Sequence, residues 1–193
     1  MEKRQKTRTL PLMSPHLRAA DQEGAKRIEG YFAVFGDVYE LWNGATESVD
    51  PHAFDGALDD DIRCLIDHDT RLVLGRNKAG TLRLWVDDKG LAFSVDINPQ
   101  DSDAMNLYAR VQRGDVSGCS FGFDILEDNM ENRPDGSVHW TLKRVKLYEG
   151  SICTFPAYQD TSAEARREDI KNSRRREVEE WKTKMKERMD KWH

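Results

Sequence analysis

The chain has 193 residues, enough for one domain of ordinary size and a tail, and the 38% that are hydrophobic allow a modest core. Its formal net charge of -5 argues against a dedicated nucleic-acid binder, because such proteins present basic patches to phosphate groups. No apolar run approaches the roughly 20 residues of a membrane span, and the basic start lacks the apolar core of a signal peptide. We therefore expect a protein that acts in the cytoplasm, away from membranes.

Residues 1–25 are polar and contain Pro11 and Pro15, which predicts a flexible N-terminal arm with room for a short strand around Leu10–Met13. The following segments alternate apolar and polar residues, which is typical of strands. The expected strands are 27–35, 38–42, 62–66, 82–86, 91–97, 116–126, 138–145 and 147–155, and a short strand or a turn is expected over 72–74.

Turn and cap residues lie between these strands. Pro51, preceded by Asp50, favours the start of a short helix. The tetrapeptide Asp87-Asp88-Lys89-Gly90 indicates a hairpin loop, in which we expect Gly90 to supply a positive φ. A helix is predicted over Gln100–Arg113, since apolar residues recur there at helical spacing and Gly114 follows as a C-terminal cap.

The composition changes at about residue 162, where Arg, Lys and Glu begin to dominate. Apolar residues then recur every three or four positions, which predicts a long helix with one narrow apolar stripe; they are Val178, Trp181, Met185, Met189 and Trp192. Such a stripe packs on the body of the protein, pairs with its own copy, or binds a scaffold or shell protein. We thus expect an arm over 1–25, a domain over 26–160 and a helical tail over 161–193.

The uncharged stretch Ser117–Phe123 alternates small and aromatic residues, which indicates a buried central strand. Its Ser120 is a candidate nucleophile, although a small residue in a central strand also serves close packing. A serine hydroxyl needs a neighbouring base. Of the five histidines, only His68 follows a buried strand and has carboxylates on both sides, and Glu149 lies in a strand expected to pair with the central one. Glu149 could equally be a solvated strand residue.

The sequence gives weaker support for metal, cofactor or cysteine chemistry. Neighbouring residues of a strand point to opposite faces, and no second His or Cys lies at ligand spacing from Asp67-His68-Asp69, so we expect no metal and no cofactor. The three cysteines, Cys64, Cys119 and Cys153, lie in apolar segments and are interpreted as reduced core residues, with Cys119 as an alternative nucleophile.

Several segments, in order, resemble the prohead (capsid-maturation) serine proteases of tailed bacteriophages, which are similar to the herpesvirus assembly proteases. The resemblance covers roughly residues 27–160, and its motifs are Gly30–Phe35, Glu47–Phe54, His68-Asp69 with Leu74-Gly75, Gly90-Leu91, Ser117–Phe123 and Glu149–Ala157. The sequence departs from the family pattern at His52, where the family commonly has Gly, and at Cys119, where Met is frequent. Neither departure touches the candidate catalytic residues.

The resemblance implies a mostly β fold with flanking helices (α+β), a compact antiparallel β-barrel of the herpesvirus-protease type. It implies Ser120 as nucleophile, His68 as general base and Glu149 as the third member, although the herpesvirus relatives use a second histidine in that role. Arg110 and Arg113 are near enough in sequence to be considered for the oxyanion site but are not assigned. The implied substrates are the capsid or scaffold precursor and the protease itself, inside the immature prohead.

Two other hypotheses stay open at this point. The chain could be a catalytically inactive capsid-assembly or scaffold protein on the same fold, whose tail helix does the binding. It could also be an unrelated β-barrel binding module without chemistry, in which case His68, Ser120 and Glu149 would lie far apart.

Overall fold

The computed structural model describes residues 8–13, 17–22, 24–155 and 160–190. The chain divides into two units, residues 1–158 and 159–193, and each is described by itself. The elements, in chain order, are β1 (Arg8–Met13), β2 (Arg18–Gln22), β3 (Ala25–Val34), β4 (Tyr39–Trp42), β5 (Ala45–Val49), β6 (Arg63–Ile66), β7 (Asp69–Arg76), the 3-10 turn η1 (Asn77–Ala79), β8 (Leu82–Val86), β9 (Gly90–Asp96), α1 (Ser102–Arg113), β10 (Gly118–Asn132), β11 (Val138–Cys153) and α2 (Asp160–Asp190).

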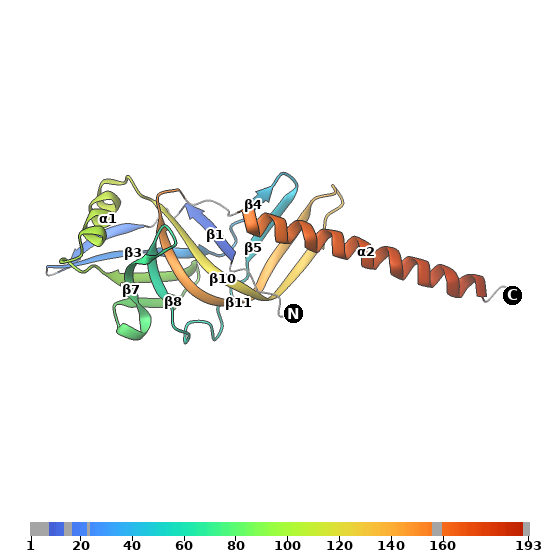
Figure 1. The fold of residues 1–193 in the computed structure, drawn as a ribbon, viewed down its shortest axis with the longest axis horizontal. Coiled ribbons are helices and arrows are strands. Elements are labelled where there is room, and N and C mark those ends of the chain that lie inside the picture. Colours follow the sequence, from blue (N-terminus) through green and yellow to red (C-terminus); the bar gives the residue numbers. More distant parts are fainter. Residues whose placement is uncertain (1–7, 14–16, 23, 156–159, 191–193) are drawn as a thin grey trace. The chain divides into compact units, whose positions relative to one another are not determined.

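The strands form two sheets, and the long hairpin of β10 and β11 runs through the larger one (Figure 1). Its strand order is β1-β10-β11-β5-β4, and β6 and β7 extend it from β11. The outer edge of β11 pairs in parallel with β5 along Val138–Leu142 and with β6 along Glu149–Ile152. The smaller sheet has the order β2-β3-β9-β8. Because β6 joins the far half of β11, the segment that follows β6 arrives beside residues 149–153.

Aromatic side chains from both sheets make up much of the core. Phe32 of the smaller sheet stacks on Phe93 with ring centroids 3.9 Å apart, and Phe121 of β10 stacks on Phe123 at 4.7 Å. A Cβ atom added at Gly150 would overlap the ring of Phe32. Gly150 is therefore the position at which the smaller sheet presses against β11, and this face of the hairpin is the core face.

The fold is mostly β with two helices, as predicted, but the described strands do not close into a barrel. β1 and β4 end the path of the larger sheet, and β2 and β8 are the edges of the smaller one. The expectation of a closed barrel is corrected accordingly. Two sheets packed face to face and a closed barrel require the same alternation of apolar residues, so the sequence pattern did not separate them.

Some local expectations also differ from the structure. Residues 51–59 form successive turns rather than a short helix. The two strands expected over 138–145 and 147–155 are one continuous strand, β11. Within the segment expected to be an arm with one short strand, both β1 and β2 are strands. Gly90 does not have a positive φ; a Cβ there would instead overlap the carbonyl oxygen of Ala33 on the neighbouring strand.

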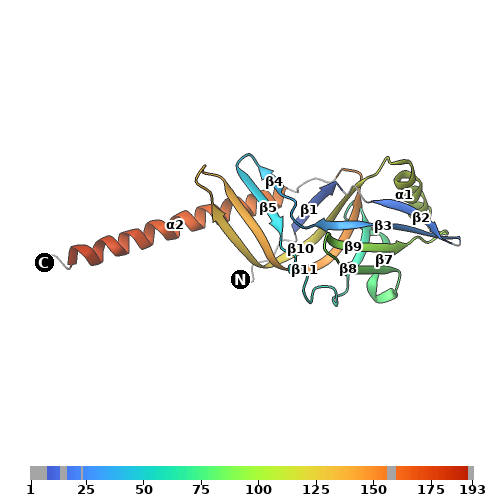
Figure 2. The same cartoon turned by 180° about the vertical axis from the view of Figure 1, so that it is seen from behind.

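The helix α1 is confirmed, and it lies against β2 and β3 at the end of the body opposite β4 and β5 (Figures 1 and 2). The carboxylate of Asp101 caps its N-terminus by accepting hydrogen bonds from the backbone N–H groups of Asp103 and Ala104, at 2.9 and 3.2 Å. Gly114 ends it in the left-handed conformation, at φ 82°. Its buried face consists of Ala104, Leu107, Tyr108 and Val111.

The second unit contains α2, a single helix of 31 residues. Val178, Trp181 and Met185 are exposed on it, which agrees with an apolar stripe at this spacing. Trp192 lies outside the described residues, and only the backbone of Met189 is described. Among the residues that the structure describes, no helix is long and apolar enough to span a membrane.

Candidate active site

The pairing of β10 with β11 places four residues with small or polar side chains on one face of the hairpin. Ser120 lies opposite Ser151, and Gly122 lies opposite Glu149. Directly opposed residues of an antiparallel pair share a face, as do residues two apart along a strand. Phe121 and Gly150, which lie between them, face the core. A bulge follows at Gly122/Phe123 and ends this pattern.

His68 reaches this face through a tight turn at the end of β6. Asp67 and His68 both have positive φ values, 48° and 59°, which is costly for residues with a side chain, on the order of 1–3 kcal/mol each. Hydrogen bonds to the end of β11 and the residue that follows it hold the turn. The Asp67 carboxylate accepts a hydrogen bond from the backbone N–H of Thr154 at 2.8 Å, and the backbone N–H of His68 donates to Ser151 Oγ at 3.1 Å.

A chain of hydrogen bonds then links His68, Glu149 and Ser151. His68 Nδ1 lies 2.7 Å from Glu149 Oε1, and Ser151 Oγ donates to Glu149 Oε2 at 2.6 Å. The histidine and glutamate side chains are only 20% and 14% exposed. With Nδ1 donating its proton to the carboxylate, Nε2 of a neutral ring is left as an acceptor. This is the arrangement that a general base requires.

Gly122 makes room for the carboxylate of Glu149. A Cβ atom at position 122 would overlap Glu149 Oε1. The carboxylate therefore lies over β10, two residues from Ser120 along the same face. Any side chain at position 122 would push it away, which explains a glycine in the middle of a central strand.

Ser120 is completely buried, and its Oγ has no hydrogen-bond partner among the described residues. The structure thus joins His68 to Glu149 and puts Ser120 on the same face of the hairpin, but it does not join Ser120 to His68. An unpaired polar atom in the interior is costly and rare in folded proteins. Among the described residues, Asp124 Oδ1 is also buried without a partner.

The other candidates from the sequence lie in less reactive settings. Cys64, Cys119 and Cys153 are buried and form no disulfide, and burial raises the pKa of the Cys153 thiol to about 12. Cys119 precedes Ser120 on the strand and so faces the core side. His139 is buried between Thr46 Oγ1 and Ser48 Oγ, at 2.8 and 2.9 Å, and burial lowers its pKa.

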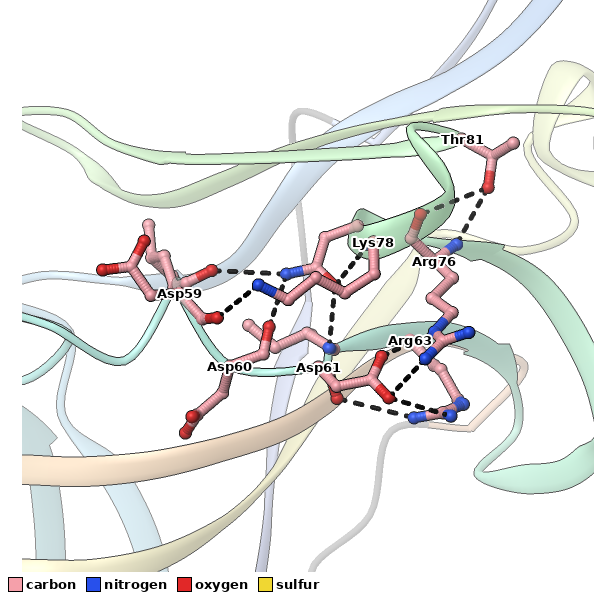
Figure 3. Close-up of polar contacts among 10 residues, drawn as sticks. Asp59, Asp60, Asp61, Arg63, Arg76, Lys78 and Thr81 are labelled. Atoms are coloured by element: carbon pink, nitrogen blue, oxygen red, sulfur yellow. Dashed lines mark hydrogen bonds and ion pairs between the residues drawn. The ribbon is translucent and has the colours of Figure 1, made fainter.

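A polar cluster holds the beginning of β6 to the end of β7 (Figure 3). The Arg76 guanidinium donates two hydrogen bonds to Asp61, at 2.6 and 2.7 Å, and this contact lowers the pKa of the Asp61 carboxyl. Lys78 Nζ donates to the carbonyl of Asp59 at 2.6 Å, and Asn77 Oδ1 accepts from the backbone N–H of Ile62 at 2.9 Å. The cluster therefore anchors the strand pair whose connecting turn carries His68.

Ser151 is a site residue to which sequence reasoning gave no role. It belongs to a Glu-x-Ser pattern on a strand, and residues two apart on a strand share a face, so this spacing was the signal for a contact between Ser151 and Glu149. Within the described part of the chain, no three His, Cys, Asp or Glu residues are grouped as a metal site would require.

Comparison with known proteins gives a family match over most of the chain. A family model described as caudovirus prohead serine protease matches residues 14–176. The chain is also 29% identical over 157 residues to the prohead protease of Enterobacteria phage HK97, and this alignment covers 79% of the chain and 67% of that protein. No solved structure matches the chain. The span matched by the family model includes His68, Ser120 and Glu149.

Proposed function

The chain belongs to the caudovirus prohead serine protease family, and on this premise we propose that it cleaves the capsid or scaffold precursor of the immature phage shell with Ser120, His68 and Glu149 as its catalytic residues. The observation that carries this assignment is the bond from His68 to Glu149 on the strand face that Ser120 shares. Membership of the family makes the protein a serine protease of phage prohead maturation. The residues and the substrates are the proposal.

The proposed reaction follows from the chemistry of these groups. Ser120 Oγ attacks the carbonyl carbon of the scissile peptide while His68 Nε2 accepts the proton of the Ser120 hydroxyl. Glu149 holds the ring in orientation and stabilises the imidazolium that forms. The imidazolium then returns the proton to the leaving amine, and the acyl-enzyme ester is hydrolysed by a water that His68 activates in the same way.

Ser151 is a positioning residue in this proposal. Its hydroxyl donates to the Glu149 oxygen that does not contact His68, and it accepts from the backbone of His68. It thereby ties the carboxylate and the strained turn to each other. The base lies in the turn after β6 and its orienting carboxylate lies on β11, so a shared contact of this kind restricts their relative movement.

The substrates are proposed from the family and from the relative's name, prohead protease. A protease that matures a prohead acts on the chains assembled in that particle, namely the capsid protein or its scaffold portion, inside the particle in the host cytoplasm. We extend this to the protease itself, with the segment after about residue 160 as a self-cleaved product or a targeting segment. Association of two copies through the apolar stripe of α2 is a further part of the proposal.

The second candidate is an assembly or scaffold protein without activity on the same fold. The bond from His68 to Glu149 and the unpaired Ser120 hydroxyl weigh against it, because neither feature serves a purely structural strand pair. A binding module without chemistry would leave the three residues scattered, whereas the register of β10 and β11 puts Ser120 and Glu149 on one face.

The test is co-expression with the shell protein that is encoded next to this chain, followed by measurement of the masses of both chains. We expect Ser120→Ala to lower cleavage at least about 10³-fold while the fold is retained, because the nucleophile is lost. Ser117→Ala is the matched control, since Ser117 is an exposed serine in the same segment. This variant should cleave the shell protein at the wild-type rate. Wild-type cleavage by purified Ser120→Ala would show that another residue is the nucleophile.

A further inference from the structure

The strand beside the candidate nucleophile is β1, the edge strand of the larger sheet (Figure 1). It pairs antiparallel with β10 from Arg8 opposite Phe123 to Met13 opposite Gly118, and Pro11 lies directly opposite Ser120. On its other side, β10 pairs with β11, where Ser151 lies opposite Ser120. Both backbone edges of β10 at Ser120 are therefore occupied by strands of the chain itself.

This arrangement conflicts with the reaction that Ser120 is proposed to perform. Ser120 is completely buried, with its Oγ unpartnered. A peptide carbonyl has to approach a nucleophile to within about 3–3.5 Å before it can react. Some part of the protein must therefore move away from Ser120 for a substrate to enter.

Of the two neighbours, β1 is the one that can leave at low cost. β11 carries Glu149 and Ser151 and also pairs with β5 and β6, so its departure would dismantle the site and the sheet. β1 has six residues and, among the described strands, is hydrogen-bonded to β10 alone.

We propose that this edge of β10 is the surface on which the enzyme binds an extended peptide, and that β1 is an internal occupant which the substrate displaces. The inference rests on the proposed function and deepens it. The partner is a segment of polypeptide in β conformation, which pairs its backbone antiparallel to β10 with its scissile residue at the level of Ser120. Strand addition of this kind draws affinity from backbone hydrogen bonds, so that side chains set only the preference among sequences.

An occupant on the same chain has a regulatory consequence. A tethered segment competes at an effective concentration on the order of millimolar, so dilute peptides displace it poorly. Substrate chains packed inside one particle are concentrated enough to compete. The free enzyme then has low activity, and it becomes active inside the particle in which its substrate is assembled.

The ladder itself offers a matched pair of variants. A proline keeps an antiparallel ladder intact only where its nitrogen points away from the partner strand. Because the register of β1 and β10 continues without a shift through Pro11, we infer that the Pro11 nitrogen points away from β10. Backbone directions alternate along a strand, so Thr9 has the orientation of Pro11, whereas the N–H of Leu10 points toward β10. Leu10→Pro therefore removes a ladder bond and Thr9→Pro does not.

The experiment measures the rate at which a fluorophosphonate labels Ser120 in the full-length chain, followed by mass spectrometry. We expect Leu10→Pro to be labelled at least several-fold faster than wild type, and Thr9→Pro at the wild-type rate. Equal labelling of all three proteins, with native near-ultraviolet circular dichroism, would overturn the inference and leave the catalytic assignment intact. No labelling of Ser120 in any form would overturn the catalytic assignment on which the inference rests.

A second measurement keeps the test decisive if Leu10→Pro fails to fold. A synthetic peptide with the sequence of β1, Arg-Thr-Leu-Pro-Leu-Met, is added at millimolar concentration, to match the tethered strand, while the wild-type enzyme cleaves the shell protein. We expect it to raise KM without lowering kcat, because it competes for the edge of β10. The same peptide with proline in place of its first leucine should have no effect. Equal behaviour of the two peptides would overturn the inference.

Discussion

Ser151 connects the two groups that any base at this site depends on, the carboxylate of Glu149 and the backbone of His68. Sequence reasoning reached His68, Ser120 and Glu149 as candidates because each has a reactive side chain in or next to an apolar strand. It did not reach the function of Ser151 or Gly122. Their importance depends on which atoms they meet across the hairpin, and a residue type does not contain that information.

We expect Ser151→Ala to lower kcat by about 10- to 100-fold with little change in KM. A hydrogen bond to a charged group contributes roughly 1.5–3 kcal/mol, and each 1.36 kcal/mol of lost transition-state stabilisation is a factor of ten in rate. Steady-state kinetics on a peptide from the shell protein measures this. Ser151→Thr keeps the hydroxyl and should recover part of the rate. A kcat equal to that of wild type in Ser151→Ala would remove Ser151 from the site.

At the scale of elements, most helices and strands could be predicted from periodicity and from caps. The sequence pattern was misleading where one residue type has two possible structural reasons, as glycine has in a positive φ and in close approach to another backbone. Gly90 was expected to supply a positive φ in the loop between β8 and β9. It is instead required by close approach, since any Cβ at this position would overlap the carbonyl of Ala33 on β3. Only the pairing of β3 with β9, residues far apart in sequence, reveals this.

The two explanations for Gly90 predict different mutational behaviour. If close approach is the cause, Gly90→Ala and Gly90→Asn should both destabilise the protein, by about 1–3 kcal/mol from steric overlap. If a positive φ were the cause, asparagine would be tolerated, because it adopts left-handed conformations readily. Gly136→Asn is the control, since Gly136 does have a positive φ, 83°, with open space around it. Urea unfolding measures all three, and a stable Gly90→Asn would contradict the explanation.

At the scale of the whole molecule, the chain consists of a mostly β body and a separate helical unit. Arg, Lys and Glu dominate the sequence of α2, while Val178, Trp181 and Met185 are exposed on it. We propose that this unit directs the protease into the shell during assembly. A helix with an exposed apolar stripe and charged flanks is suited to a partner helix.

Deletion of residues 163–193 should therefore leave the body folded and the labelling of Ser120 unchanged, while incorporation into assembled particles falls. Quantitative mass spectrometry of purified particles measures incorporation. Substitution of Val178, Trp181 and Met185 by serine should have the same effect, whereas Lys184→Ala should not. Equal incorporation of the truncated protein would contradict a targeting function for α2.

The sequence by itself determined the mostly β class, the capped helix α1, the helical tail and the three candidate catalytic residues. These depend on local periodicity, on cap chemistry and on the resemblance of ordered motifs to a family. The tertiary structure alone decided that the sheets stay open, that Glu149 lies over Gly122 beside His68, and that β1 occupies the edge of β10. The physical reason is that strand register and sheet edges are set by contacts between residues far apart in the chain, and the alternation of apolar residues is the same for every register shifted by two.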